Sequence, residues 1–166
     1  TYPSSSQGGI EKVVLQPDGK IIVLGSFYEF NGLNSESIIR LNEDGSVDNT
    51  FSYPTNVNNP ILSAALQPNG KIIIGGVFTN YNGSSQNYIA RLNANGTLDN
   101  TFISGSAANA QLRAIALQNN GQIMIGGLFT SYNGIGRNRI ARLNNCSGTT
   151  FSTISATSCN AYTAPN

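Results

Sequence analysis

The chain has 166 residues, enough for one domain with its own core, and its nine basic and eight acidic residues give a formal charge of +1. This balance lacks the excess of positive charge expected for nucleic-acid binding, and no run of about twenty apolar residues is present to span a membrane. Charged residues make up only 10% of the chain, and its many Gly, Asn, Ile, Tyr and Phe residues favour short strands joined by tight turns.

The chain repeats itself three times at an interval of 51 residues. The stretch LQPDGKIIVLGSFYEFNG at 15–32 returns as LQPNGKIIIGGVFTNYNG at 66–83 and as LQNNGQIMIGGLFTSYNG at 117–134. A period of this length is typical of architectures in which each unit packs against the next one. The predicted parts are three units, 1–51, 52–102 and 103–151, and a Ser/Thr-rich tail, 152–166.

Each copy is predicted to form four short strands, as the second copy illustrates. Its first two pieces, 61–67 and 71–78, flank a Pro-Asn-Gly turn signal. Apolar residues fill the start of the second piece, as in a strand that is covered on both faces. A polar loop at 79–87 leads to an alternating piece at 88–93, and a last short piece follows at 97–102. The pattern indicates a four-stranded antiparallel sheet in each copy, with helix nearly absent.

Two architectures fit a four-stranded unit of this length. Blades of a β-propeller have about 40–50 residues, and about four to eight of them usually close a ring. A β-trefoil instead completes one domain with three such repeats, so the number of copies favours the trefoil. The internal pattern favours the blade, because the second strand is apolar on both faces and Gly75-Gly76 permits close packing of neighbouring sheets. We predict an all-β fold of three tandem propeller-type blades, with the β-trefoil as the alternative.

The repeated motif also resembles a known family. The first copy carries LQPDGKI at 15–21, IIRLN at 38–42 and DGSVDNTF at 44–51, and related segments recur in the second copy. The pattern is similar to the delta-sixty repeat, an uncharacterised β-propeller repeat of large secreted bacterial proteins. The third copy departs from it, with Asn119 for Pro, Gln122 for Lys and no Asp-Asn-Thr-Phe at its end.

This resemblance implies a location and a context. The tail SATSCNAYTAPN at 155–166 resembles the start of a Ser/Thr-rich, Cys-containing module of Bacteroidota adhesins. The resemblance therefore implies a segment of a larger adhesin-like polypeptide that is secreted or displayed on the cell surface.

The residue types give little support for catalysis. The chain has no His, and seven of its eight carboxylates precede residue 50. We therefore predict that the chain is not an enzyme and needs no cofactor. The turn at 42–48 resembles the start of a calcium loop, but the other copies lose most of its acids, which favours a metal-free turn. The mid-strand arginines are interpreted as structural donors to carbonyls or to the repeated glutamines: Arg40, Arg91 and Arg142, with Gln16, Gln67 and Gln118.

The middle loops are the candidate binding segments, because each presents an aromatic residue before Asn-Gly. Such residues could stack on a sugar and hydrogen-bond to it. The candidate ligand-binding residues are Phe30, Asn31, Tyr81, Asn82, Tyr132 and Asn133. In the tail, Cys146 and Cys159 either form a disulfide with each other, pair elsewhere or stay free.

The charges are distributed unevenly among the copies. The formal charge is −4 for residues 1–51, +1 for 52–102 and +4 for 103–153. We predict that the acidic first unit meets the basic third unit of another copy, closing a ring or extending a filament, unless further repeats of the parent chain cover both ends. The predicted function is a scaffold and protein-contact module of an extracellular bacterial adhesin or filament. The alternative is a lectin-like domain that binds surface glycans.

Overall fold

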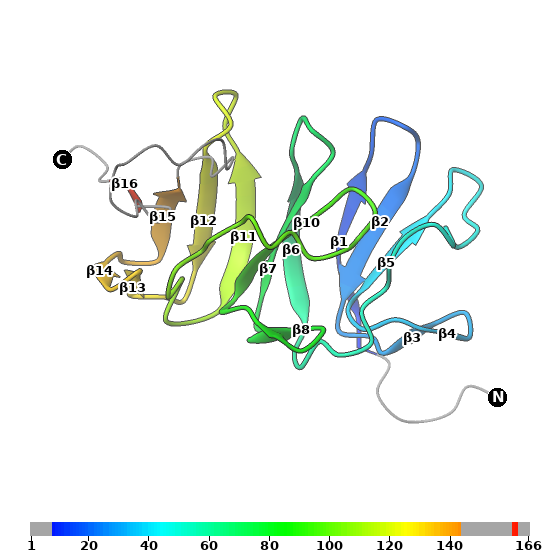
Figure 1. Ribbon diagram of the computed structural model, residues 1–166, viewed down its shortest axis with the longest axis horizontal. Coiled ribbons are helices and arrows are strands. Elements are labelled where there is room, and N and C mark those ends of the chain that lie inside the picture. The colour runs from blue at the N-terminus through cyan, green and yellow to red at the C-terminus, as the bar shows by residue number, and fades with distance from the viewer. Residues whose placement is uncertain (1–7, 144–160, 163–166) are drawn as a thin grey trace.

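The computed structural model describes residues 8–143 and 161–162 and consists of three antiparallel sheets with three small hairpins (Figure 1). All regular structure in these residues is β. Over the same residues, no helix is present that would be long and apolar enough to cross a membrane.

Each repeat supplies the sheet that we call a blade, built from its first three predicted strands in antiparallel order. The predicted all-β fold of three tandem blades is confirmed, and the β-trefoil alternative is wrong. Blade 1 contains β1 (Ile10–Leu15), β2 (Ile21–Gly25) and β5 (Ile38–Leu41); blade 2 contains β6 (Ile61–Leu66), β7 (Ile72–Gly76) and β10 (Ile89–Leu92); blade 3 contains β11 (Leu112–Leu117), β12 (Ile123–Gly127) and β15 (Ile140–Leu143).

The predicted fourth strand is reduced to a single pair of residues in blades 1 and 2. Leu92 pairs with Leu98, as Leu41 pairs with Val47 in blade 1. The strand stops there because the next residue, Asp99, accepts hydrogen bonds from the backbone N–H and hydroxyl of Thr101 and so turns the chain. In blade 3, the same edge pairs with β16 (Ala161–Tyr162), in which Ala161 lies opposite Leu143.

The middle loops are more regular than the predicted polar loops, because each folds into a two-residue hairpin. Each Asn-Gly pair takes positive φ angles, 50° at Asn82 and 82° at Gly83, as a tight hairpin turn requires. The hairpins are β3 (Glu29–Phe30) with β4 (Leu33–Asn34), β8 (Asn80–Tyr81) with β9 (Ser84–Ser85), and β13 (Ser131–Tyr132) with β14 (Ile135–Gly136).

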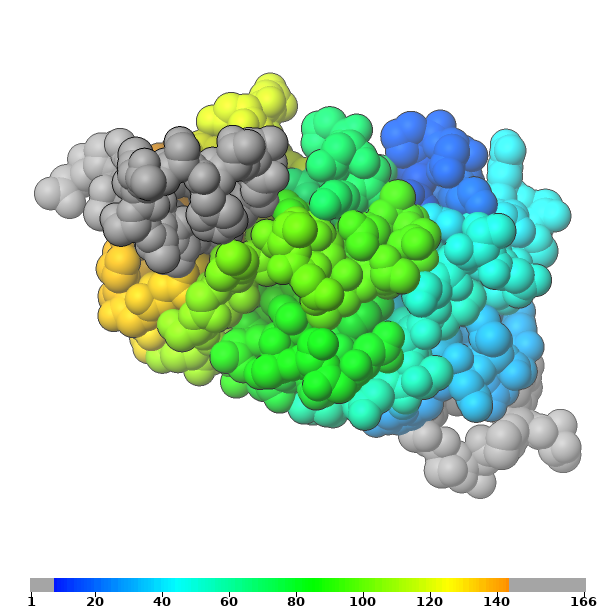
Figure 2. Space-filling model, in the orientation of Figure 1, coloured from blue at the N-terminus to red at the C-terminus, as the bar shows by residue number. Residues whose placement is uncertain are grey.

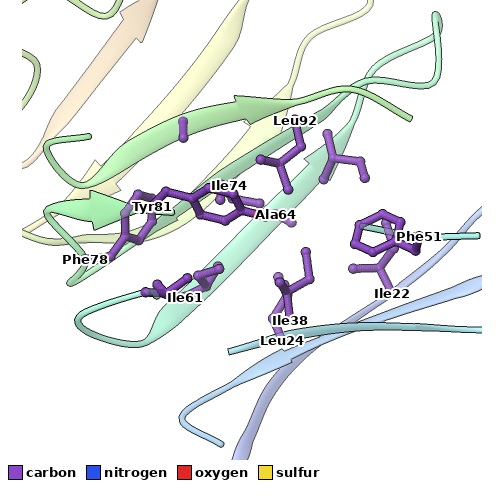
Figure 3. Close-up of a cluster of buried hydrophobic side chains, with 13 residues drawn as sticks. Ile22, Leu24, Ile38, Phe51, Ile61, Ala64, Ile74, Phe78, Tyr81 and Leu92 are labelled. Atoms are coloured by element: carbon purple, nitrogen blue, oxygen red, sulfur yellow. The ribbon is translucent and has the colours of Figure 1, made fainter. Parts of the chain in front are cut away.

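The core lies between the blades. Figure 3 shows buried side chains of blade 1, among them Leu24 and Ile38, facing Ile61 and Ala64 of blade 2. Blade 2 packs against blade 3 in the same way, and a Cβ added to Gly75 would lie 2.7 Å from Cδ1 of Ile115. The glycine therefore leaves the space that the isoleucine fills.

The blades spread outward from their first strands. β1 lies beside β6, and β6 lies beside β11, whereas the third strands of neighbouring blades are farther apart. Ser63 supports this close approach, because its hydroxyl oxygen accepts a hydrogen bond from the Ile115 N–H of the next blade (3.1 Å). Figure 2 also shows the chain after β10, in green, lying against blade 1. Sheets that radiate in this way are the blades of a β-propeller.

The residue before each third strand has a left-handed backbone. Ser37, Tyr88 and Arg139 occupy equivalent positions, with φ angles of 63°, 66° and 68°. At Arg139, the N–H donates to the carbonyl of Phe129 and the carbonyl accepts from the N–H of Gly127. Because both backbone groups are bonded in the sheet, the residue cannot relax to negative φ without losing them.

Arg139→Gly is therefore expected to raise the free energy of unfolding by about 0.5–1 kcal/mol, since glycine adopts positive φ without steric cost and the Arg139 side chain is exposed. Urea unfolding followed by circular dichroism measures the change. Asn138→Gly, at an exposed neighbouring position without positive φ, is the control and should not stabilise the chain. A less stable Arg139→Gly variant would contradict the assignment of strain to this residue.

Candidate functional site

The Asn-Gly hairpins, which carry the predicted ligand residues, are held by the linker that enters the same blade. Asn82 donates its N–H to the carbonyl of Asn56, and its side-chain oxygen accepts from the N–H of Thr55 (3.1 Å). Asn133 makes both bonds with Ala107 in blade 3. These two asparagines therefore attach each hairpin to the linker that precedes its blade through hydrogen bonds.

A second asparagine completes each attachment and was missed in the sequence. The side-chain oxygen of Asn58 accepts from the N–H groups of Thr79 and Asn80, at 2.9 and 3.0 Å. Asn109 bonds in the same way to Thr130 and Ser131 in blade 3. The signal was the recurrence of Asn at an interval of 51 residues in a linker that otherwise varies.

The aromatic residues of these hairpins do not share one environment. Tyr81 and Tyr132 are fully buried, and burial raises the pKa of both phenols. Tyr81 donates its hydroxyl to the carbonyl of Gly96 (3.3 Å). The prediction that a sugar stacks on these two rings is therefore wrong, because the rings belong to the core. Phe30 is half-buried and Asn31 is exposed, so a ligand role for these two residues stays a prediction.

The part of the chain that the structure describes gives no candidate centre for a metal ion. Over residues 8–143, no three His, Cys, Asp or Glu side chains lie together as a metal site would require. In the turn that resembled a calcium loop, Asp44 instead accepts hydrogen bonds from the N–H and hydroxyl of Ser46. Cys146 and Cys159 lie outside the described residues, so their pairing stays a prediction.

Blades 1 and 2 each contain one buried aspartate between two cations. Asp99 accepts from Nζ of Lys71 (2.7 Å) and from Nε of Arg91 (2.6 Å). Asp48 makes the same two ion pairs with Lys20 and Arg40, at 2.6 and 2.8 Å. We call each set of three residues a buried ionic cluster. Since charges are buried at a high cost unless they are paired, the clusters are structural elements of the blade edge.

In blade 1, the arginine of the cluster also links this blade to the next one. Arg40 donates from Nη1 to the carbonyl of Ala94 in blade 2 (2.6 Å), and its guanidinium lies 4.5 Å from the centre of the Phe51 ring. The predicted structural role with carbonyl groups fits Arg40, but its aspartate partner was missed. The signal was available, because the third copy has Gln122 in place of the Lys and no Asp before its closing Phe151.

The pKa of each buried aspartate is lowered by its hydrogen-bonding partners. Burial by itself would raise the pKa of Asp99, but hydrogen bonds from Lys71, Thr101 and Arg91 together hold it well below its ordinary value. For Asp48, burial is likewise outweighed by Lys20, Thr50 and Arg40. Because the folded-state pKa is lowered, the stabilisation is complete above the unfolded pKa and is lost as the pH falls toward the folded value.

Asp99→Asn is expected to lower the free energy of unfolding by about 3 kcal/mol at neutral pH, since Lys71 and Arg91 lose their buried counter-charge. The loss of stability on acidification below about pH 4 should also be smaller in this variant. Urea unfolding at several pH values measures both effects. Asp18→Asn, at an exposed turn, is the control and should change little. Equal effects of the two substitutions would rule out a structural role for the cluster.

The outer faces of blades 1 and 3 expose side chains that the internal faces bury. Ile10 is 54% exposed, whereas the equivalent Ile61 and Leu112 are fully buried. On the opposite face, Ile140 is 62% exposed, whereas the equivalent Ile38 and Ile89 are fully buried. We call the first surface the back face of blade 1 and the second the front face of blade 3. These terminal faces are the strongest candidate for a functional surface on the described residues, because exposed apolar surface of this kind marks contact sites.

Comparison with known families identifies the repeats. The model of the family described as "Domain of unknown function (DUF5122) beta-propeller" matches residues 16–51, 67–102 and 118–150. No curated protein and no solved structure matches the chain. The three matches cover more than half of the sequence and coincide with the repeats that form the blades. The chain therefore belongs to the DUF5122 β-propeller repeat family.

Proposed function

We propose that the chain is a non-enzymatic repeat module of a large bacterial surface adhesin or filament, where it serves outside the cell as a scaffold and protein-contact surface. The exposure of Ile10 and Ile140 at positions that are buried in the other two repeats carries this proposal. Faces built to pack against a sheet are suited to binding another protein rather than to remaining in water.

The internal arrangement suits a scaffold. Each blade is joined to its neighbour by an apolar interface, and Arg40 adds a polar link from blade 1 to blade 2. The buried aspartates are engaged by two cations each, which favours a structural role for these carboxylates over general acid or base catalysis. The alternative of glycan binding is less well supported, because Tyr81 and Tyr132 are buried and offer no stacking surface.

Surface display is tested with an antibody raised against the purified chain. We expect it to label intact cells of the bacterium that encodes the protein. Cells that carry Ile10→Asp together with Ile140→Asp should still be labelled but should attach less well to a surface or to one another, because a charge on each terminal face prevents packing.

Ile135→Asp is the matched control, since Ile135 is also exposed but lies on the β13–β14 hairpin rather than on a terminal face. Attachment of these cells should equal that of the wild type. Labelling that requires permeabilised cells, or an equal loss of attachment in both variants, would overturn the proposed function.

A further inference from the structure

The residues of the two terminal faces are the repeat equivalents of residues that pack against each other at the internal interfaces. We propose that each terminal face is covered by a second copy of this chain, the front face of blade 3 packing on the back face of blade 1 of the partner, so that two chains close a six-bladed ring. The inference deepens the proposed function, since it names the protein that the contact surface binds.

The first support is the complementary size of side chains across the interfaces. Between blades 1 and 2, the large Leu24 is matched by the small Ala64. At the equivalent positions between blades 2 and 3 the sizes are exchanged, and Gly75 is matched by Ile115. The same two positions on the terminal faces are Gly126 and Val13, again a small residue and a large one. This pair therefore resembles Gly75 and Ile115, with the small residue on the front face and the large one on the back face.

Both members of the terminal pair are accessible. A Cβ added to Gly126 would meet nothing closer than 3.7 Å, whereas at Gly75 it would collide with Ile115. Val13 is 53% exposed, and Ile10 on the same strand is also exposed. The front face of blade 3 thus offers a space at the place where the back face of blade 1 offers an apolar side chain.

The turns that join neighbouring blades give a second, independent support. In the internal interface, the turn after β10 brings Gly96 against blade 1, where an added Cβ would lie 2.6 Å from the ring of Phe51. The equivalent Gly45 in blade 1 has nothing within 4 Å of the same added atom. The turn of blade 1 therefore carries the same glycine that packs against the preceding blade at the internal interface, but here no atom lies close to it.

The charges at this turn match the opposite end of the chain. Arg40 reaches the carbonyl of Ala94 across the internal interface, and in the proposed contact the same register places Arg142 opposite Glu43. Glu43 and its neighbour Asp44 are exposed acids, where blade 2 has the neutral Ala94 and Asn95. The acidic turn thus lies in the acidic first repeat, with a formal charge of −4, and would meet the repeat whose formal charge is +4. Complementary charges of this kind favour contact between a first and a third repeat over contact between two first repeats or two third repeats.

The number of blades indicates how the contact closes. Propellers usually contain about four to eight blades, and two copies of the three described blades supply six. The sheets already spread outward from β1, β6 and β11, which is the arrangement that a ring requires. A head-to-tail interface either propagates or closes, and two three-bladed chains close with two identical contacts.

Light scattering during size-exclusion chromatography of the full 166-residue chain tests the proposal. The expected mass is twice the 17.5 kDa of the single chain, with dissociation favoured at high salt and low concentration. Gly126→Leu should give a monomer, because the leucine fills the space that Val13 of the partner occupies. Adding Val13→Ala should restore the dimer, since the pair then matches the internal pair Leu24 and Ala64.

Gly136→Leu is the matched control, since a Cβ at this exposed glycine meets nothing within 4 Å and the residue belongs to the β13–β14 hairpin rather than to the sheet of a terminal face. It should remain a dimer, and circular dichroism should show that every variant retains its sheet. A wild-type chain of 17.5 kDa at all concentrations, an open series of higher masses, or a dimeric Gly126→Leu variant would overturn the inference. A monomer whose parent protein is still displayed on cells would overturn only this inference and leave the proposed function standing.

Discussion

The apolar contact between successive blades is the interaction on which the rest of the structure depends. A blade has side chains such as Ile73 and Ile74 on opposite faces of one strand, and both are fully buried because a neighbouring blade covers each face. A single sheet of this kind would expose one or both apolar faces to water. The stability of the chain therefore comes from stacking, with size matching at pairs such as Gly75 and Ile115 that sets the register between blades.

The buried ionic clusters close the edge of the blade where the apolar contact ends. Asp99 forms ion pairs with Lys71 and Arg91, and it also accepts the Thr101 N–H, which ends the pairing of the following segment with β10. One side chain therefore both neutralises the buried cations and limits the length of the sheet. The third repeat lacks the Lys and the Asp, and its edge pairs instead with β16 at the C-terminal end of the described chain. The last blade thus differs from the other two at its outer edge, while its packing face toward blade 2 is unchanged in character.

The repeat interval and the turn signals were sufficient to predict the all-β fold, the first three strands of each blade and their antiparallel order. Three features depended on contacts that a local pattern does not contain. Asp99 lies 28 residues from Lys71, so their pairing appears only after the sheet has formed. Tyr81 resembled a surface aromatic because it stands beside polar residues, but its hairpin folds back against the linker at Val57 and buries the ring. The terminal faces were inferred from the unmatched ends of a repeat array, and the residues that form them became evident only from their exposure.

One chain thus contains two completed interfaces, while Ile10 and Ile140 at its two ends are exposed at positions that these interfaces bury. The measurement that tests the central claim most directly is equilibrium unfolding of residues 52–102 as a separate polypeptide, compared with the full chain by circular dichroism. If stability comes from stacking, the isolated blade 2 shows no cooperative transition, whereas the full chain unfolds cooperatively. A cooperative transition in the isolated blade would show that a single repeat is stable by itself and would contradict the account.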